Sequence, residues 1–256
     1  MPLEETEAVV LKTSPCAEQD KIVVLFSRER GVLRGVAKGA RKFGNRFGSS
    51  LEPLSIVRAF FYEKERRELV TISNCDLLES FFEAQRDPRV ANTAAFFAEL
   101  IEEFSPPLAR DEDLYRLLTT VLRALAAGGD PAFLTAYYDV WFLRFNGLLP
   151  NLSRCRACRK PVSAGWLAPR RDGAFCPACA PVKKDELPAE AAAFLAWAKK
   201  NSPLRTAEHP FTPDELLRIR KALEAMIVFH LEREPKSLRF LNDAPRPADA
   251  KRREPV

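Results

Sequence analysis

Two pairs of cysteines constrain the fold of this chain more than any other feature. Cys155 and Cys158 form one C-x-x-C pair, Cys176 and Cys179 form a second, and seventeen residues separate the pairs. A two-residue spacer lets both thiolates of a pair face one centre, and a second pair completes a tetrahedral shell around a metal ion. The spacing predicts a four-cysteine module, residues 153–181, that holds one structural zinc ion. An iron site or an iron–sulfur cluster is the alternative, because thiolates suit both metals.

The cellular context favours a metal over disulfides. The chain has 256 residues and six cysteines, with no apolar N-terminal segment and no apolar run long enough to cross a bilayer. We therefore expect a cytoplasmic protein without membrane contact, in a compartment that keeps thiols reduced. Cys16 and Cys75 have no cysteine at ligand spacing and are expected to be apolar fillers. Neither C-x-x-C pair is followed by the glycine that tight zinc ribbons often have.

The first part of the chain is rich in β-forming residues. Short apolar runs occupy residues 7–12, 21–27, 31–38, 54–64 and 67–73, and glycines, Pro53 and charged pairs separate them. Five short strands with no helical periodicity between them predict a five-stranded OB-type β-barrel over residues 1–78.

After Asp76 the apolar period changes from two to about 3.6. Asp87-Pro88 and Asp130-Pro131 each predict an N-cap followed by proline at the first helical position, and Thr212-Pro-Asp-Glu215 predicts a capping box. The fold class is thus α+β and multidomain, with a helical domain over residues 79–152 and 182–241 into which the four-cysteine zinc module is inserted. The polar, proline-rich tail, 242–256, is predicted to be disordered.

Positive charge is concentrated in one segment. Between Arg28 and Arg46 the chain has seven cations and one anion, whereas its total formal charge is +5. Four glycines and two phenylalanines lie among these cations in the stretch RGVAKGARKFGNRFG, residues 34–48. A local excess of cations in a glycine-rich loop indicates an anionic partner. The alternative is a solvated, flexible loop without a partner.

Catalytic motifs are missing from the sequence. Gly39 to Gly44 is followed by Asn45 and not by the lysine of a phosphate-binding P-loop, and neither His209 nor His230 has a nucleophile nearby in the sequence. We therefore predict that the protein is not an enzyme. A metal-dependent nuclease is the remaining enzymatic alternative, although no carboxylate or histidine cluster supports it.

Taken together, these features resemble the bacterial RecO family of recombination mediators. The resemblance spans about residues 4–241 and includes both local motifs and the order of the parts. The motifs are VLKT at 10–13, EQDKI at 18–22, GVAKGARK at 35–42, RFG at 46–48, LEPL at 51–54, HL at 230–231, KS at 236–237 and FL at 240–241.

The resemblance implies a function in DNA repair and recombination after DNA damage. A RecO protein is an ATP-independent, nucleoid-associated DNA-binding protein that anneals complementary single strands. With its partner RecR it helps RecA to displace single-strand-binding protein during gap repair, so single- and double-stranded DNA, RecR and single-strand-binding protein are the expected partners and RecA an indirect one. The DNA-binding residues would be Arg34, Lys38, Arg41, Lys42, Phe43, Arg46 and Phe47.

Three questions stay open at this point. Phe43 and Phe47 either stack on bases or anchor the loop to the barrel. The cations around the cysteines, such as Arg154 and Arg170, either stay solvated or extend a phosphate-contacting surface. The whole protein could also be an adaptor whose zinc module and helices bind other proteins.

Overall fold

The computed structural model describes residues 2–63 and 69–243, except for the side chains of residues 206–208, 242 and 243. The chain divides into two compact units. One contains the chain up to Leu122 and again from Pro235, and the other is Arg123–Glu234. The boundary at Leu122 lies inside the span predicted as one helical domain, and the predicted domain limits stay predictions. The predicted disordered tail lies outside the described residues from residue 244 onward.

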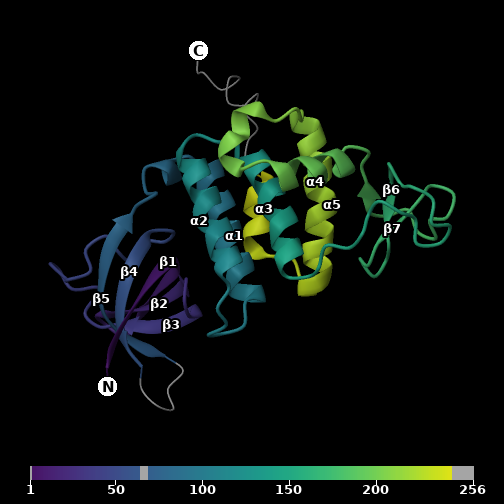
Figure 1. Ribbon diagram of the computed structural model, residues 1–256. Helices are drawn as coiled ribbons and strands as arrows, with labels where there is room; N and C mark the ends of the chain where they lie inside the picture. Colours follow the sequence, from purple (N-terminus) through teal and green to yellow (C-terminus); the bar gives the residue numbers. More distant parts are fainter. Residues whose placement is uncertain (1, 64–68, 244–256) are drawn as a thin grey trace. The chain divides into compact units, whose positions relative to one another are not determined.

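The N-terminal strands close into a five-stranded barrel (Figure 1). They are β1 (Leu3–Cys16), β2 (Asp20–Ser27), β3 (Gly31–Ala37), β4 (Ile56–Tyr62) and β5 (Val70–Glu79). Their order around the barrel is β1-β2-β3-β5-β4; β3 and β5 run parallel, and the other neighbours run antiparallel. The five predicted strands are therefore confirmed.

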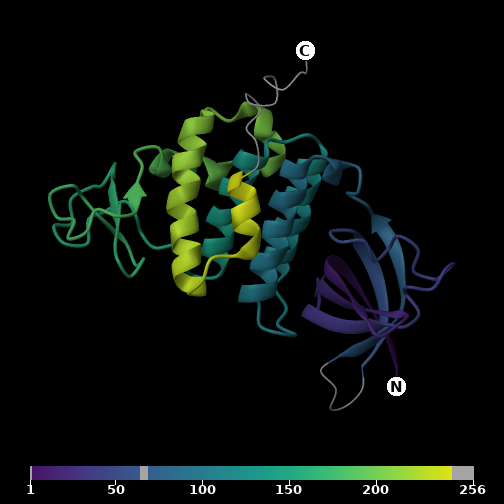
Figure 2. The same ribbon diagram turned by 180° about the vertical axis from the view of Figure 1, so that it is seen from behind.

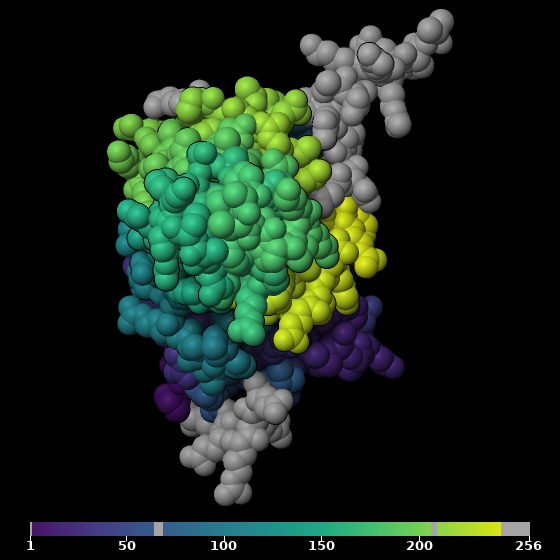
Figure 3. All heavy atoms as spheres, turned by 90° about the vertical axis from the view of Figure 1, so that its right-hand side faces the viewer, coloured from purple at the N-terminus to yellow at the C-terminus, as the bar shows by residue number. Residues whose placement is uncertain are grey.

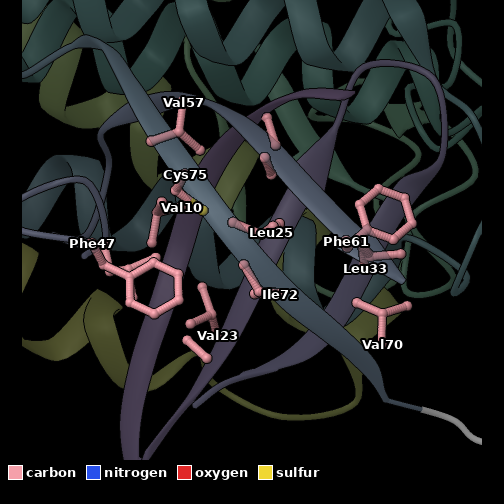
Figure 4. Packing of buried hydrophobic residues seen from close by; sticks show 14 of the residues in the cluster. Val10, Val23, Leu25, Leu33, Phe47, Val57, Phe61, Val70, Ile72 and Cys75 are labelled. Atoms are coloured by element: carbon pink, nitrogen blue, oxygen red, sulfur yellow. The ribbon is translucent and has the colours of Figure 1, made fainter. Parts of the chain in front are cut away.

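The barrel core follows from the alternation of side chains along each strand. Successive residues of a strand point to opposite faces of the sheet, so every second residue points into the barrel. Val23 and Leu25 of β2 and Val57 and Phe61 of β4 lie on this inner face and are buried. Figure 4 shows these side chains packed together with Phe47, which comes from the loop between β3 and β4.

Three α-helices and one 3-10 turn belong wholly or largely to the same unit. They are η1 (Ala84–Arg86), α1 (Pro88–Phe104), α2 (Glu112–Ala126) and α6 (Lys236–Asp243). Asp87 caps α1 through the N–H of Arg89, as predicted. The carboxylate of Glu99 on α1 accepts hydrogen bonds from the N–H groups of Lys236 and Ser237, so a side chain of α1 caps the first turn of α6.

The second unit contains three α-helices, a 3-10 turn and a small sheet. The helical elements are α3 (Pro131–Phe145), α4 (Ala191–Lys200), η2 (Pro203–Glu208) and α5 (Pro213–Leu231), and the strands are β6 (Gly165–Leu167), β7 (Ala174–Phe175) and β8 (Glu186–Leu187), in the order β7-β6-β8. The predicted cap at Asp130 and the predicted capping box at Thr212 are both present. Seen from behind, β6 and β7 lie beyond α4 and α5 of the same unit (Figure 2). None of the described helices combines the length and apolar character needed to cross a bilayer.

Ionisable side chains are buried among the helices of the second unit. Asp139 on α3 is 0% exposed, and neither carboxylate oxygen has a hydrogen-bond partner within the described residues. Arg220 and Glu224 on α5 form a buried ion pair at 2.8 Å. Burial raises the pKa of Asp139 well above its usual value, and Glu224 raises it further while Arg220 opposes the shift.

We predict that Asp139 makes folding stability depend on pH. The pKa of Asp139 is raised in the folded state, so the unfolded chain loses this proton first as pH rises. The stability that Asp139 contributes to folding is therefore complete below the unfolded pKa of about 3.9 and is lost as pH rises through the folded pKa. Asp139→Asn has no carboxylate to ionise, so its stability relative to the wild type should increase from pH 5 to pH 8. Urea unfolding of both proteins at the two pH values measures this. A constant difference would mean that the folded pKa of Asp139 is not raised into or above this range.

Candidate nucleic-acid interface and metal centre

The segment between β3 and β4, residues 38–55, is called the basic loop here. It is a succession of tight turns closed by backbone hydrogen bonds: the N–H groups of Lys42, Asn45 and Ser50 donate to the carbonyls of Gly39, Lys42 and Phe47 at 3.0–3.2 Å. The side chain of Asn45 accepts from the N–H groups of Phe47 and Gly48. Hydrogen-bonded turns therefore run along the loop from Gly39 to Ser50.

The first half of the basic loop is attached to the turn between β1 and β2. The carboxylate of Asp20 accepts from the N–H of Gly39 at 2.8 Å, and the carbonyl of Gln19 accepts from the N–H of Arg41 at 2.9 Å. The guanidinium of Arg41 also donates to the carbonyls of Ala17 and Glu18. These bonds hold residues 39–42 against the barrel.

The second half is attached through the barrel core. Phe47 is only 3% exposed and belongs to the core cluster, together with Ala40 and Leu51. Figure 4 shows its ring beside Val23. A ring buried in the core offers no open face to a base, so burial favours the alternative in which Phe47 anchors the loop to the barrel. Phe43 is the opposite case, because its side chain is 107% exposed.

The predicted DNA-contacting cations differ in what they already bind. Lys38, Arg41, Lys42 and Arg46 are all exposed or partly exposed. Arg46 donates to the carbonyl of Ser73, and its guanidinium lies 4.7 Å from the centre of the Phe47 ring. Lys38 and Lys42 have no acidic partner within residues 2–63 and 69–243.

The other cations of the basic segment pair with distant carboxylates. Arg34 on β3 pairs with Glu102 of α1 at 3.0 Å, and Arg28 pairs with Glu112 of α2 at 2.7 Å. Arg30 pairs with Glu4 at 2.7 Å and with Glu63 at 2.5 Å. Hydrogen bonding to Arg28 lowers the pKa of the Glu112 carboxyl, as an ion pair does. Among the seven cations of this segment, those of the basic loop are therefore the ones presented without a carboxylate partner in the described part of the chain.

The four predicted metal ligands lie together. The sulfur atoms of Cys155, Cys158, Cys176 and Cys179 are all within 4.8 Å of one another, and Cys158 Sγ is 3.8 Å from Cys176 Sγ. A tetrahedron with metal–sulfur bonds of ~2.3 Å has edges of ~3.8 Å, whereas a disulfide bond is ~2.05 Å long. The donor set therefore fits one tetrahedral metal ion and leaves no open coordination position.

The local fold around the cysteines follows from the short strands. β6 and β7 pair Trp166 with Phe175, and the bridge between Cys155 and Ala174 places the first cysteine pair beside β7, which leads into Cys176. The N–H of Arg159 donates to the carbonyl of Cys155 at 2.9 Å. Arg159 has φ +61°, a left-handed conformation that favours glycine. The absence of glycine after the first pair is thus accommodated by arginine in a glycine-like conformation.

The thiols of the cluster shift one another's pKa values. Backbone N–H groups of Cys158 and Cys176 lower the pKa of Cys155 to about 6. Hydrogen bonding with the Cys176 and Cys158 side chains raises the pKa of Cys179 to about 12. Four thiolates at this spacing repel one another, and a divalent ion at their centre would remove that repulsion. Cys75, in contrast, is buried in the barrel, and burial raises its pKa to about 12.

Cations surround the four-cysteine module, and three of them make contacts within the second unit. Arg156 pairs with Asp172, and Arg171 pairs with Asp185 while donating to the carbonyl of Ala225 on α5. Lys183 lies over the ring of Trp166 at 5.3 Å. Figure 3 shows this part of the surface in teal and green.

The second unit also has a groove between its helices and the four-cysteine module. It has a volume of about 620 Å³. Its lining is mostly apolar, with Arg144, Lys199 and Lys200 among the lining residues and no carboxylate. Sequence reasoning did not identify this groove, because its residues come from separate stretches of the chain.

Comparison with known proteins agrees with the resemblance in the sequence. The family model "Recombination protein O N terminal" matches residues 1–81, and "Recombination protein O C terminal" matches residues 85–239. The "DNA repair protein RecO" of Koribacter versatilis is 34% identical over 242 residues, which are 94% of this chain and 98% of the relative. That of Pelotomaculum thermopropionicum is 32% identical over 249 residues, 94% of each chain. The chain therefore belongs to the RecO family of DNA repair proteins.

Proposed function

We propose that this protein is a non-catalytic recombination mediator that binds single- and double-stranded DNA and anneals complementary single strands. The observation that carries the proposal is the basic loop, which presents four cations from a fixed backbone on a closed five-stranded barrel. The strand order, with β3 parallel to β5, supports an OB-type barrel, a fold that binds oligonucleotides. Family membership supports the same function.

Membership of the RecO family also suggests the protein partners. The protein would act with RecR to help load RecA onto DNA coated by single-strand-binding protein, in the bacterial cytoplasm and associated with the nucleoid. The basic loop would neutralise phosphates, and release of their counterions would drive binding and make it depend on salt.

An adaptor that acts mainly through protein contacts is the second candidate. The groove of about 620 Å³ supports it, because an apolar groove with cations and no carboxylate suits a protein segment better than a nucleic-acid strand. This candidate predicts normal capture of protein partners and normal repair in cells when the cations of the basic loop are replaced by alanine.

The test of the main proposal uses Lys38→Ala/Lys42→Ala, because these two lysines have no ion pair in the described part of the chain whose loss would disturb the fold. Each phosphate contact on a single strand contributes ~0.7 to the slope of log affinity against log salt, so the variant should lose ~1.4. The wild type should accelerate annealing of two labelled complementary strands without nucleotide, less so at higher salt. The variant should anneal more slowly.

The matched control is Lys199→Ala/Lys200→Ala, which removes the same charge from α4. It should keep the wild-type slope. An equal loss of slope in both variants would show that binding depends on net charge and not on the basic loop. No acceleration of annealing by the wild type at either salt would favour the adaptor.

For the four-cysteine cluster we propose one structural zinc ion. Bound zinc would hold the two cysteine pairs together, and the residues that would hold it are Cys155, Cys158, Cys176 and Cys179. A closed shell of four thiolates supports a structural role. Elemental analysis of purified protein should give one zinc and no iron per chain.

Removal of one cysteine ligand should unfold the module. The free energy of zinc binding to such modules, about 10–16 kcal/mol, is also the free energy that folds them. Cys155→Ser should lose the metal and make residues 153–181 susceptible to protease. Cys16→Ser is the control, since Cys16 lies outside the cluster, and it should keep both metal and protease resistance. A metal-free wild-type protein whose module resists protease would contradict the proposal.

A further inference from the structure

Phe43 is the most exposed phenylalanine in the described part of the chain. Its side chain is 107% exposed, whereas the next most exposed, Phe240, is 63% exposed. No aromatic ring or cation packs on the Phe43 ring within the described residues. Both faces of the ring are therefore open to solvent, an unfavourable state for an apolar side chain.

The backbone on both sides of Phe43 is fixed. Lys42 and Asn45 take part in the turn hydrogen bonds, and Asn45 also donates from its side chain to the carbonyl of Lys42 at 3.1 Å. Gly44 has φ +66°, and a Cβ placed on it would meet no atom within 4 Å, so the chain turns there without packing against anything. The ring is held away from the barrel between two attached segments and does not lie on a mobile tail.

Cations surround this ring in the sequence, with Arg41 and Lys42 before it and Arg46 after it. Phosphate contacts are available from single strands and duplexes alike, so these cations do not distinguish the two forms. A flat aromatic ring does distinguish them. It stacks on the face of an unpaired base, whereas in a duplex that face is covered and insertion requires unstacking at a few kcal/mol.

We infer that Phe43 stacks on an unpaired base and is the residue that makes the basic loop prefer single-stranded over double-stranded nucleic acid. The inference rests on the proposed DNA-binding function and adds the source of strand selectivity. It also gives a route for product release during annealing: once two strands pair, the base face that Phe43 held is covered, and only the phosphate contacts remain.

The experiment compares the affinities of the wild type and three Phe43 variants for a labelled single strand and for the corresponding duplex across a salt series. Phe43→Ala should weaken single-strand binding roughly 5- to 150-fold. Its duplex affinity should stay within about twofold, and its salt slope should equal that of the wild type, because no phosphate contact is removed. The substitution does not threaten the fold, since the side chain is fully exposed.

The two other variants separate stacking from apolar contact. Phe43→Trp keeps a flat ring and should keep the single-strand preference, whereas Phe43→Leu keeps apolar surface without a π face and should lose it. Equal weakening for single strand and duplex would overturn the inference in favour of a wedge that inserts into duplexes. Unchanged affinity of Phe43→Ala for both would overturn it in favour of a protein-contacting role for the ring. If the wild type itself binds neither DNA form, the proposed function fails together with the inference.

Discussion

Burial of the Phe47 ring in the barrel is the interaction on which the position of the basic loop depends. The ring occupies core space among side chains of the strands, so the loop that carries it cannot leave the barrel without opening an apolar cavity. Asn45 then fixes the turn leading into Phe47, and Asp20 fixes the other half of the loop. A loop that is already attached at both halves would lose little conformational entropy on binding an anionic partner.

The cations of the basic segment fall into two groups, those in ion pairs within the fold and those exposed on the basic loop. Arg28, Arg30 and Arg34 are close in sequence to the loop cations, yet each pairs with a carboxylate brought to it by the fold. These pairs tie strands of the barrel to one another and to α1 and α2, within one compact unit. The excess of cations in the linear sequence therefore overstates the charge offered to a ligand, and the loop residues from Lys38 onward carry what remains.

Features with local causes could be predicted from the sequence. The caps at Asp87, Asp130 and Thr212 and the C-x-x-C pairs depend on residues within a few positions of one another. The partner of Arg34 on α1, the groove of the second unit and the contact of α6 with α1 could not be predicted in this way, because each depends on contacts between distant segments. For Phe43 and Phe47, the composition of the loop was the same for both rings, and only their positions relative to the barrel distinguished an anchor from an exposed ring.

The cap that Glu99 provides for α6 has a consequence for synthesis of the chain. Residues 235–243 return to the unit that contains the barrel, after the whole of Arg123–Glu234 has been made. At ribosomal rates the ribosome needs on the order of ten seconds to add that intervening stretch. Throughout this interval α1 lacks the helix that packs on it. In the nascent chain α1 therefore lacks these contacts until α6 has been made, and this interval is the stage at which aggregation or chaperone binding has its best opportunity.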